Sequence, residues 1–183
     1  MKYINLLIIF IVSLTYNANA QKVYVGCPGK VATTPKGGFL DKQPVDLVIA
    51  DSRVIPSYGK VECEGSGVKQ VLKNFLQSEF PSCKITLLTD TLKAPNPGRI
   101  TIRIGIAAYQ ASSIKNEWTG TVSYHAMIFD NRNGKARKVT EEISNDTSKP
   151  DIIGYKAAKK CLFASFDKSN QDLVSFIEGA LKE

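Results

Sequence analysis

Isoleucine occupies every second position from Ile100 to Ile106, and the residues between are polar or glycine. Because successive side chains of a β-strand point to opposite faces of the sheet, this alternation predicts a strand with one apolar face. Such a strand is stable only when another layer of secondary structure covers that face. The rest of the chain therefore has to supply neighbouring strands and a covering layer.

Two helices are predicted as that layer. In residues 153–181 apolar side chains recur at spacings of three and four, which predicts a helix of about eight turns with one continuous apolar face. Phe166 lies near the middle of this face, so we expect it in the core. A shorter helix is predicted over residues 67–80, with Ser66 as its N-cap and Pro81 just beyond its end.

The remaining strands are predicted from alternating patterns bounded by turn residues, over residues 45–50, 84–89, 118–129 and 135–143. Residues 145–150 are expected to interrupt the chain before the closing helix. This order of elements predicts an α+β fold: a mixed or antiparallel sheet of about five strands with two helices packed on one face, a two-layer sandwich.

The first twenty residues predict export. Lys2 precedes an apolar stretch over residues 4–14, and Ala18-Asn19-Ala20 forms a cleavage site of the signal-peptidase kind. We expect a signal peptide over residues 1–20 and a mature chain that begins at Gln21. Since the apolar stretch is too short to cross a bilayer, the mature protein is predicted not to span a membrane and to reside in the periplasm or outside the cell.

The mature chain is long enough for one domain of about 160 residues and short for two. Residues 21–43 are rich in Gly, Pro, Lys and Thr and predict an irregular N-terminal arm. Residues 44–183 are expected to form the single α+β domain.

Four cysteines, Cys27, Cys63, Cys83 and Cys161, would meet an oxidising compartment after export. An even number there predicts two disulfides and no free thiol, and the spacings contain no local pair that could hold a metal. Cys63 and Cys83 flank the predicted first helix, whose length of about 20 Å exceeds the reach of a disulfide. The preferred pairing is therefore Cys27 with Cys63 and Cys83 with Cys161.

His125 is the chain's single histidine, so acid–base chemistry that needs an imidazole would have to use it. Strand alternation places it on the more polar face beside Ser123, where it is either a solvated surface residue or the base of a secreted hydrolase that uses Ser66 or a free cysteine. Glu141 and Glu142 are neighbours on a predicted strand and point to opposite faces, which excludes the paired carboxylates of a glycosidase. We predict no catalytic residue, cofactor or metal.

The formal net charge of +7 at pH 7 indicates attraction to anionic surfaces, such as phospholipid headgroups or polyanionic wall polymers. Lys156, Lys159 and Lys160 lie together on the closing helix and are candidates for such contact. The alternative is that these lysines simply form the solvated side of an amphipathic helix. No nucleic-acid partner is predicted.

From about Arg99 onward the chain resembles small bacterial envelope proteins of the YajG-like and ABC-transport auxiliary lipoprotein group. The resemblance rests on the isoleucine strand that ends at Tyr109, the Trp118-Thr119-Gly120 start of the next strand, Asp130 with Gly134-Lys135 in the hairpin, and the alanine-containing closing helix. It implies an α+β domain of the envelope that acts as a non-catalytic binding or accessory component, with an envelope protein or an anionic envelope surface as partner. The chain departs from that group because no lipid-anchor cysteine follows the predicted cleavage site.

Overall fold

A five-stranded sheet organises the computed structural model, which describes residues 26–29, 31–53, 63, 65–89, 94–134, 136–150 and 154–182. The predicted signal peptide lies outside the described residues. The elements follow one another as β1 (Pro44–Asp51), α2 (Gly65–Glu79), β2 (Lys84–Leu88), β3 (Ile100–Ile114), β4 (Glu117–Asp130), β5 (Arg137–Pro150) and α3 (Tyr155–Leu181). The strands lie in the order β2-β1-β3-β4-β5. β1 is parallel to both β2 and β3, while β3, β4 and β5 are antiparallel.

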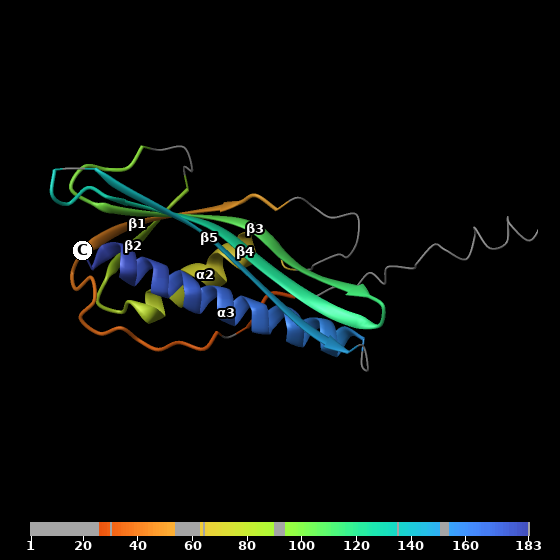
Figure 1. The fold of residues 1–183 in the computed structure, drawn as a ribbon. Coiled ribbons are helices and arrows are strands. Elements are labelled where there is room, and N and C mark those ends of the chain that lie inside the picture. The colour runs from red at the N-terminus through yellow and green to blue at the C-terminus, as the bar shows by residue number, and fades with distance from the viewer. Residues whose placement is uncertain are drawn as a thin grey trace, which may run out of the picture.

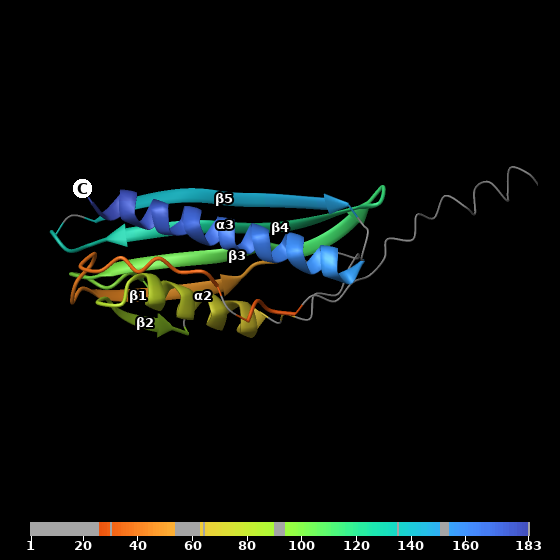
Figure 2. The same ribbon diagram turned by 90° about the horizontal axis from the view of Figure 1, so that it is seen from below.

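Both helices cover the same face of this mixed sheet (Figure 1), so the predicted α+β two-layer fold is confirmed. α3 runs along β4 and β5, whereas α2 packs against β1 (Figure 2). The core lies between the two layers. On the sheet side it contains Ile100, Ile102, Ile104 and Ile106, all at most 3% exposed, as the alternation predicts.

β3 and β4 form a long hairpin that turns at Lys115 and Asn116, both of which have a positive φ. The pairing register shifts between Ile106 and Ala108, which moves the apolar positions by one residue, so that Tyr109 faces the core after the last isoleucine. This bulge ends the simple alternation while the strand continues to Ile114.

The expected break over residues 145–150 is wrong. These residues are the end of β5 and pair with the beginning of β4, from Asn145 opposite Val122 to Pro150 opposite Glu117. The pairing is long because β4 is 14 residues long and β5 pairs with it along its whole length. Proline is tolerated at Pro150 because β5 is an edge strand.

Ser66 was expected just before the first helix, and this is also wrong. α2 begins at Gly65, so Ser66 lies exposed within its first turn and is not the N-cap residue. The apolar residues of α2 face the sheet and are buried at a helical spacing, as at Val68, Leu72 and Leu76.

The described part of the N-terminal arm contains neither helix nor strand and lies against the helix layer. The backbone N–H of Thr34 donates to Glu79 Oε1 at 2.7 Å, and Leu40 is buried. Near its start the arm is held by a disulfide between Cys27 and Cys63, whose Cα atoms are 4.6 Å apart. A bond across a separation of 36 residues restricts the unfolded chain and stabilises the fold by about 4 kcal/mol.

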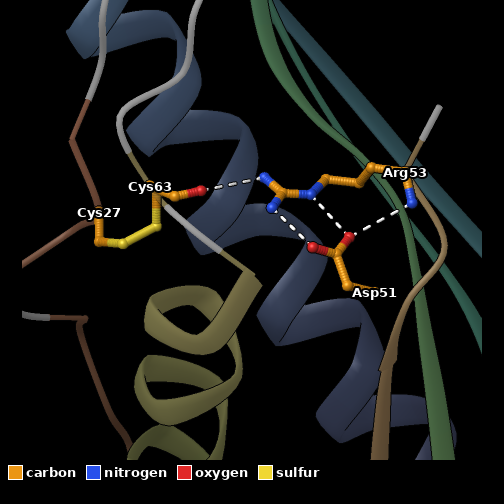
Figure 3. A network of polar contacts seen from close by, with 4 residues as sticks. All are labelled: Cys27, Asp51, Arg53 and Cys63. Atoms are coloured by element: carbon orange, nitrogen blue, oxygen red, sulfur yellow. Dashed lines mark hydrogen bonds and ion pairs between the residues drawn. A yellow bond between two sulfur atoms is a disulfide. The ribbon is translucent and has the colours of Figure 1, made fainter. Parts of the chain in front are cut away.

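Arg53 ties this disulfide to the end of β1 (Figure 3). Its Nε and Nη2 each donate to the carboxylate of Asp51 at 2.7 Å, and its Nη1 donates to the carbonyl oxygen of Cys63 at 3.3 Å. Hydrogen bonding from Arg53 lowers the pKa of Asp51 below its usual range. The disulfide thus fixes the arm to the segment before α2, and Arg53 connects that segment to the end of β1.

The predicted pairing of Cys27 with Cys63 is present, but Cys83 and Cys161 are free and buried, so the prediction of a second disulfide is wrong. The Cys83 thiol donates to the carbonyl oxygen of Gln43, just before β1, whereas the Cys161 thiol donates to that of Trp118. These positions lie at opposite ends of the sheet, about 13 strand residues apart, which is roughly 40 Å at about 3.3 Å per residue. No disulfide can bridge that distance.

Candidate functional site

The N-terminal end of α3 carries the three predicted anion-contacting lysines on a solvent-facing surface. Lys156, Lys159 and Lys160 are all exposed, and together with Phe163 they fall within an arc of about 100° around the helix axis. The ammonium group of Lys159 lies over the Phe163 ring, 5.3 Å from its centroid. We call Tyr155, the three lysines and Phe163 the basic end of α3.

Tyr155 opens the helix and is 47% exposed, which makes it the one exposed large apolar side chain among the residues that the structure describes. An aromatic ring with a polar tip suits the boundary between water and a less polar phase. Lys149, at the end of β5, is also exposed and lies opposite Trp118 in the strand pairing, close enough to Cys161 to act on its thiol electrostatically. This end of the molecule therefore combines positive charge with exposed aromatic surface.

Lys156 lies in the first turn of α3, where the helix itself is positive, and Lys159 and Lys160 follow in the second turn. The first turn of α3 contains no acidic residue, and Gly154, the N-cap residue, has no side chain that could cap the helix. The N-terminus of a helix carries about half a positive charge, and a cation there costs roughly 0.3–1 kcal/mol. An anion that lies against this end of α3 would gain from both the helix dipole and the charges of the lysines.

A row of small polar residues fixes α3 to the sheet and so turns the lysines outward. Side chains at every fourth position of the helix donate to carbonyl oxygens at every second position of β4: Cys161 to Trp118 at 3.3 Å, Ser165 to Gly120 at 2.7 Å and Ser169 to Val122 at 3.0 Å. Four helical residues rise about 6 Å and two strand residues about 6.7 Å, so the two rows stay in step. We call this row the hydroxyl–thiol seam.

The seam was not predicted, although the sequence carries its signal in small polar residues four apart on the inner face of the closing helix. Gly120 permits the close approach, because a Cβ atom there would overlap backbone atoms of Cys161 and Leu162. Burial raises the pKa of the Cys161 thiol, which keeps it a neutral donor. The seam holds the basic end rigidly in relation to the sheet.

His125 is exposed and lies on the face of the sheet opposite the helices, because its neighbours Tyr124 and Ala126 are buried in the core. Its Nδ1 is 3.4 Å from Glu142 Oε1, and both side chains are more than half exposed. Ser66 belongs to α2 on the other face, and Cys83 and Cys161 are buried. The structure does not bring any of these three nucleophile candidates together with His125, so the hydrolase alternative lacks its required pair.

Within the described ranges, no group of three or more His, Cys, Asp or Glu side chains is placed to hold a metal ion. The same residues include no helix with the length and apolar character needed to cross a membrane.

No family model matches the chain, and no curated protein matches it. Several solved structures are similar to it. A hypothetical protein of Chlamydia trachomatis has 11% identity and a TM-score of 0.47, over 76% of this chain and 97% of the other. A lipoprotein of Neisseria meningitidis has 14% identity and a TM-score of 0.40, over 73% of this chain and 98% of the other.

A third similar structure, the PelC dodecamer of Paraburkholderia phytofirmans, has 12% identity and a TM-score of 0.39, over 70% of this chain and 88% of the other. The similar solved structures thus include a bacterial lipoprotein. The specific resemblance to the YajG-like group stays a prediction. None of these similarities assigns a ligand or an activity to this chain.

Proposed function

We propose that the chain is an exported, non-catalytic component of the bacterial envelope that docks on anionic phospholipid headgroups through the basic end of α3. Export is supported by the predicted signal peptide over residues 1–20 and by the Cys27–Cys63 disulfide, which is typical of an oxidising compartment.

The observation that carries the proposal is the crowding of three exposed lysines in the first two turns of α3, beside an exposed tyrosine. A lysine close to an anionic membrane surface contributes about 1 kcal/mol, so three of them supply about 3 kcal/mol. Tyr155 and Phe163 favour a lipid interface over a fully hydrated polymer, because their rings can bury apolar surface at the headgroup level.

Vesicle binding tests the proposal. The mature protein, with its disulfide intact, is mixed with phosphatidylcholine vesicles that contain about 30% phosphatidylglycerol and, separately, with pure phosphatidylcholine vesicles. We expect co-sedimentation with the anionic vesicles, weakened by added salt because screening shortens the reach of the charges.

The variant Lys156→Gln/Lys159→Gln/Lys160→Gln should weaken binding roughly a hundredfold, as expected for the loss of about 3 kcal/mol. A matched control removes three exposed lysines at the other end of the molecule, Lys42, Lys84 and Lys182, by the same change to glutamine. This control lowers the net charge equally and should retain most of the binding. Equal losses in the two triple variants would mean that only overall charge acts, and the proposed site would be wrong.

A further inference from the structure

The outer edge of β5 is unpaired in the part of the chain that the structure describes. β5 is the last strand of the order β2-β1-β3-β4-β5 and is 14 residues long. Alternate backbone N–H and C=O groups of such an edge point away from the sheet and can pair with a further strand. A long edge is therefore a template for an extended peptide segment.

A groove runs beside this edge, between β5 and the C-terminal half of α3, with a volume of about 380 Å³. Its lining residues are Glu141, Glu142, Ile143, Ser144, Asp172, Ser175 and Phe176. Ile143 is buried and Phe176 is half-buried, so the base of the groove offers apolar surface to one side chain of an incoming strand. Glu141 and Asp172 supply two carboxylates to the groove, and no basic residue lines it. The carboxylate of Glu142 lies beside His125 on the opposite face of the sheet.

One of these carboxylates is held in place by a buried partner. Asn145 is 6% exposed, and its Nδ2 donates to Asp172 Oδ2 at 2.8 Å and lies 3.2 Å from Ser169 Oγ in the hydroxyl–thiol seam. Asp172 is thus connected to the helix–sheet interface, and its position at the groove is preorganised. The formal net charge of the protein is +7 at pH 7, so the negatively charged groove is opposite in sign to the protein as a whole.

We propose that this groove binds an extended, positively charged segment of a partner protein, which adds to the sheet beside β5. Backbone hydrogen bonds to the β5 edge would supply affinity, an apolar side chain would fill the space over Ile143 and Phe176, and a lysine or arginine would pair with Glu141 and Asp172. Acidic residues at an edge repel negatively charged strands, so the same carboxylates select the partner by charge. The inference is independent of lipid docking, because it rests on other residues of α3.

The probe is a synthetic nine-residue peptide with lysine and valine taking turns at the odd positions and threonine at the even positions, so that lysine and valine share the face that meets the groove. Its counterpart carries glutamate in place of each lysine. Amide chemical shifts of the isotope-labelled mature protein are followed while each peptide is added. We expect the lysine peptide to shift the amides of β5 around Ile143 and those of α3 around Phe176, and the glutamate peptide to shift none of them. Binding should weaken with added salt.

The variant Glu141→Gln/Asp172→Asn removes two charges with little change of shape, and the amide oxygen that replaces a carboxylate oxygen of Asp172 can still accept from Asn145. It should weaken binding of the lysine peptide about three- to tenfold. The control Asp41→Asn/Glu117→Gln, which removes two exposed carboxylates elsewhere, should leave that binding unchanged. Both variants should bind anionic vesicles at least as well as the unchanged protein.

Three results would overturn the inference: equal affinity for the two peptides, shifts centred away from β5, or equal weakening in the two double variants. A self-associated protein whose β5 amides shift on dilution without peptide would also overturn it, since a second copy would then occupy the edge. The glutamine variant of the three α3 lysines serves as a further check. It should bind the lysine peptide with unchanged affinity even if vesicle binding is lost.

Discussion

Gly120→Ala should destabilise the protein strongly, because one methyl group there has no space. A Cβ atom at Gly120 would overlap backbone atoms of Cys161 and Leu162. Backbone atoms cannot rotate away as a flexible side chain can, so α3 would have to move away from β4. That movement would lengthen the hydrogen bond from Ser165 to the Gly120 carbonyl oxygen, which is 2.7 Å in the structure.

The expected magnitude follows from two costs. Overpacking a core contact costs about 1–3 kcal/mol. Ser165 and Ser169 are fully buried, so a hydroxyl that loses its acceptor costs about another 1–3 kcal/mol. A total near 3 kcal/mol is a large part of the 5–15 kcal/mol that typically holds a domain together, and it should lower Tm by about 6–12 °C.

Urea and thermal unfolding, followed by far-ultraviolet circular dichroism on the non-reduced protein, measure this effect. The matched control is Gly105→Ala on the neighbouring strand β3, where a Cβ atom would lie 3.7 Å from the nearest atom, an ordinary contact. The control should change stability by less than about 0.5 kcal/mol. If the two alanine variants unfold within about 1 kcal/mol of each other, α3 does not depend on close approach to β4 and the reasoning fails.

Two further predictions concern α3 and the thiols. Phe166→Ala should lower the free energy of unfolding by about 3–5 kcal/mol, because Phe166 is fully buried. Its ring also packs edge-to-face on Tyr109, with 5.7 Å between the ring centroids. An unchanged urea midpoint would contradict its place in the core. Thiol titration of the unfolded, unreduced protein should find two thiols per chain, Cys83 and Cys161, and zero or four would contradict the pairing. In the folded protein both should resist iodoacetamide near pH 8, since burial raises the pKa of Cys83 to about 11 and also raises that of Cys161.

The class of the fold was predictable because its evidence is local. The isoleucine alternation and the long helical repeat each lie within one segment, and each specifies a face that needs covering. The order of the strands was not predictable in the same way. β1 lies between β2 and β3 because of pairings between segments far apart in the chain, such as Leu47 with both Leu87 and Ile102.

The errors have a common physical origin in tertiary pairing. Residues 145–150 are polar and look like a connection, yet β4 offers them hydrogen-bonding partners and they form a strand. Cys83 and Cys161 are the two cysteines left after the first disulfide, so their number suggests a second bond, but they are far apart on the sheet and stay free. For the candidate site, the lysine stripe was visible in the sequence, while the exposure of Tyr155, the seam and the acidic groove depend on how α3 sits on the sheet.

The two proposed surfaces lie on one rigid element, and this bears on whether they can be occupied together. Lys160 and Asp172 are twelve positions apart on α3, which corresponds to about 18 Å along the helix axis. That separation is about twice the screening length of about 8 Å at physiological ionic strength, so a membrane at the lysines would barely weaken the attraction of a cationic peptide to the groove. The seam meanwhile prevents α3 from turning on the sheet, so contact of the basic end with lipid also fixes the direction in which the groove opens. Screening keeps the two binding events energetically independent, and the rigid seam gives them a fixed geometry. An accessory protein needs both properties to hold a partner segment near a membrane.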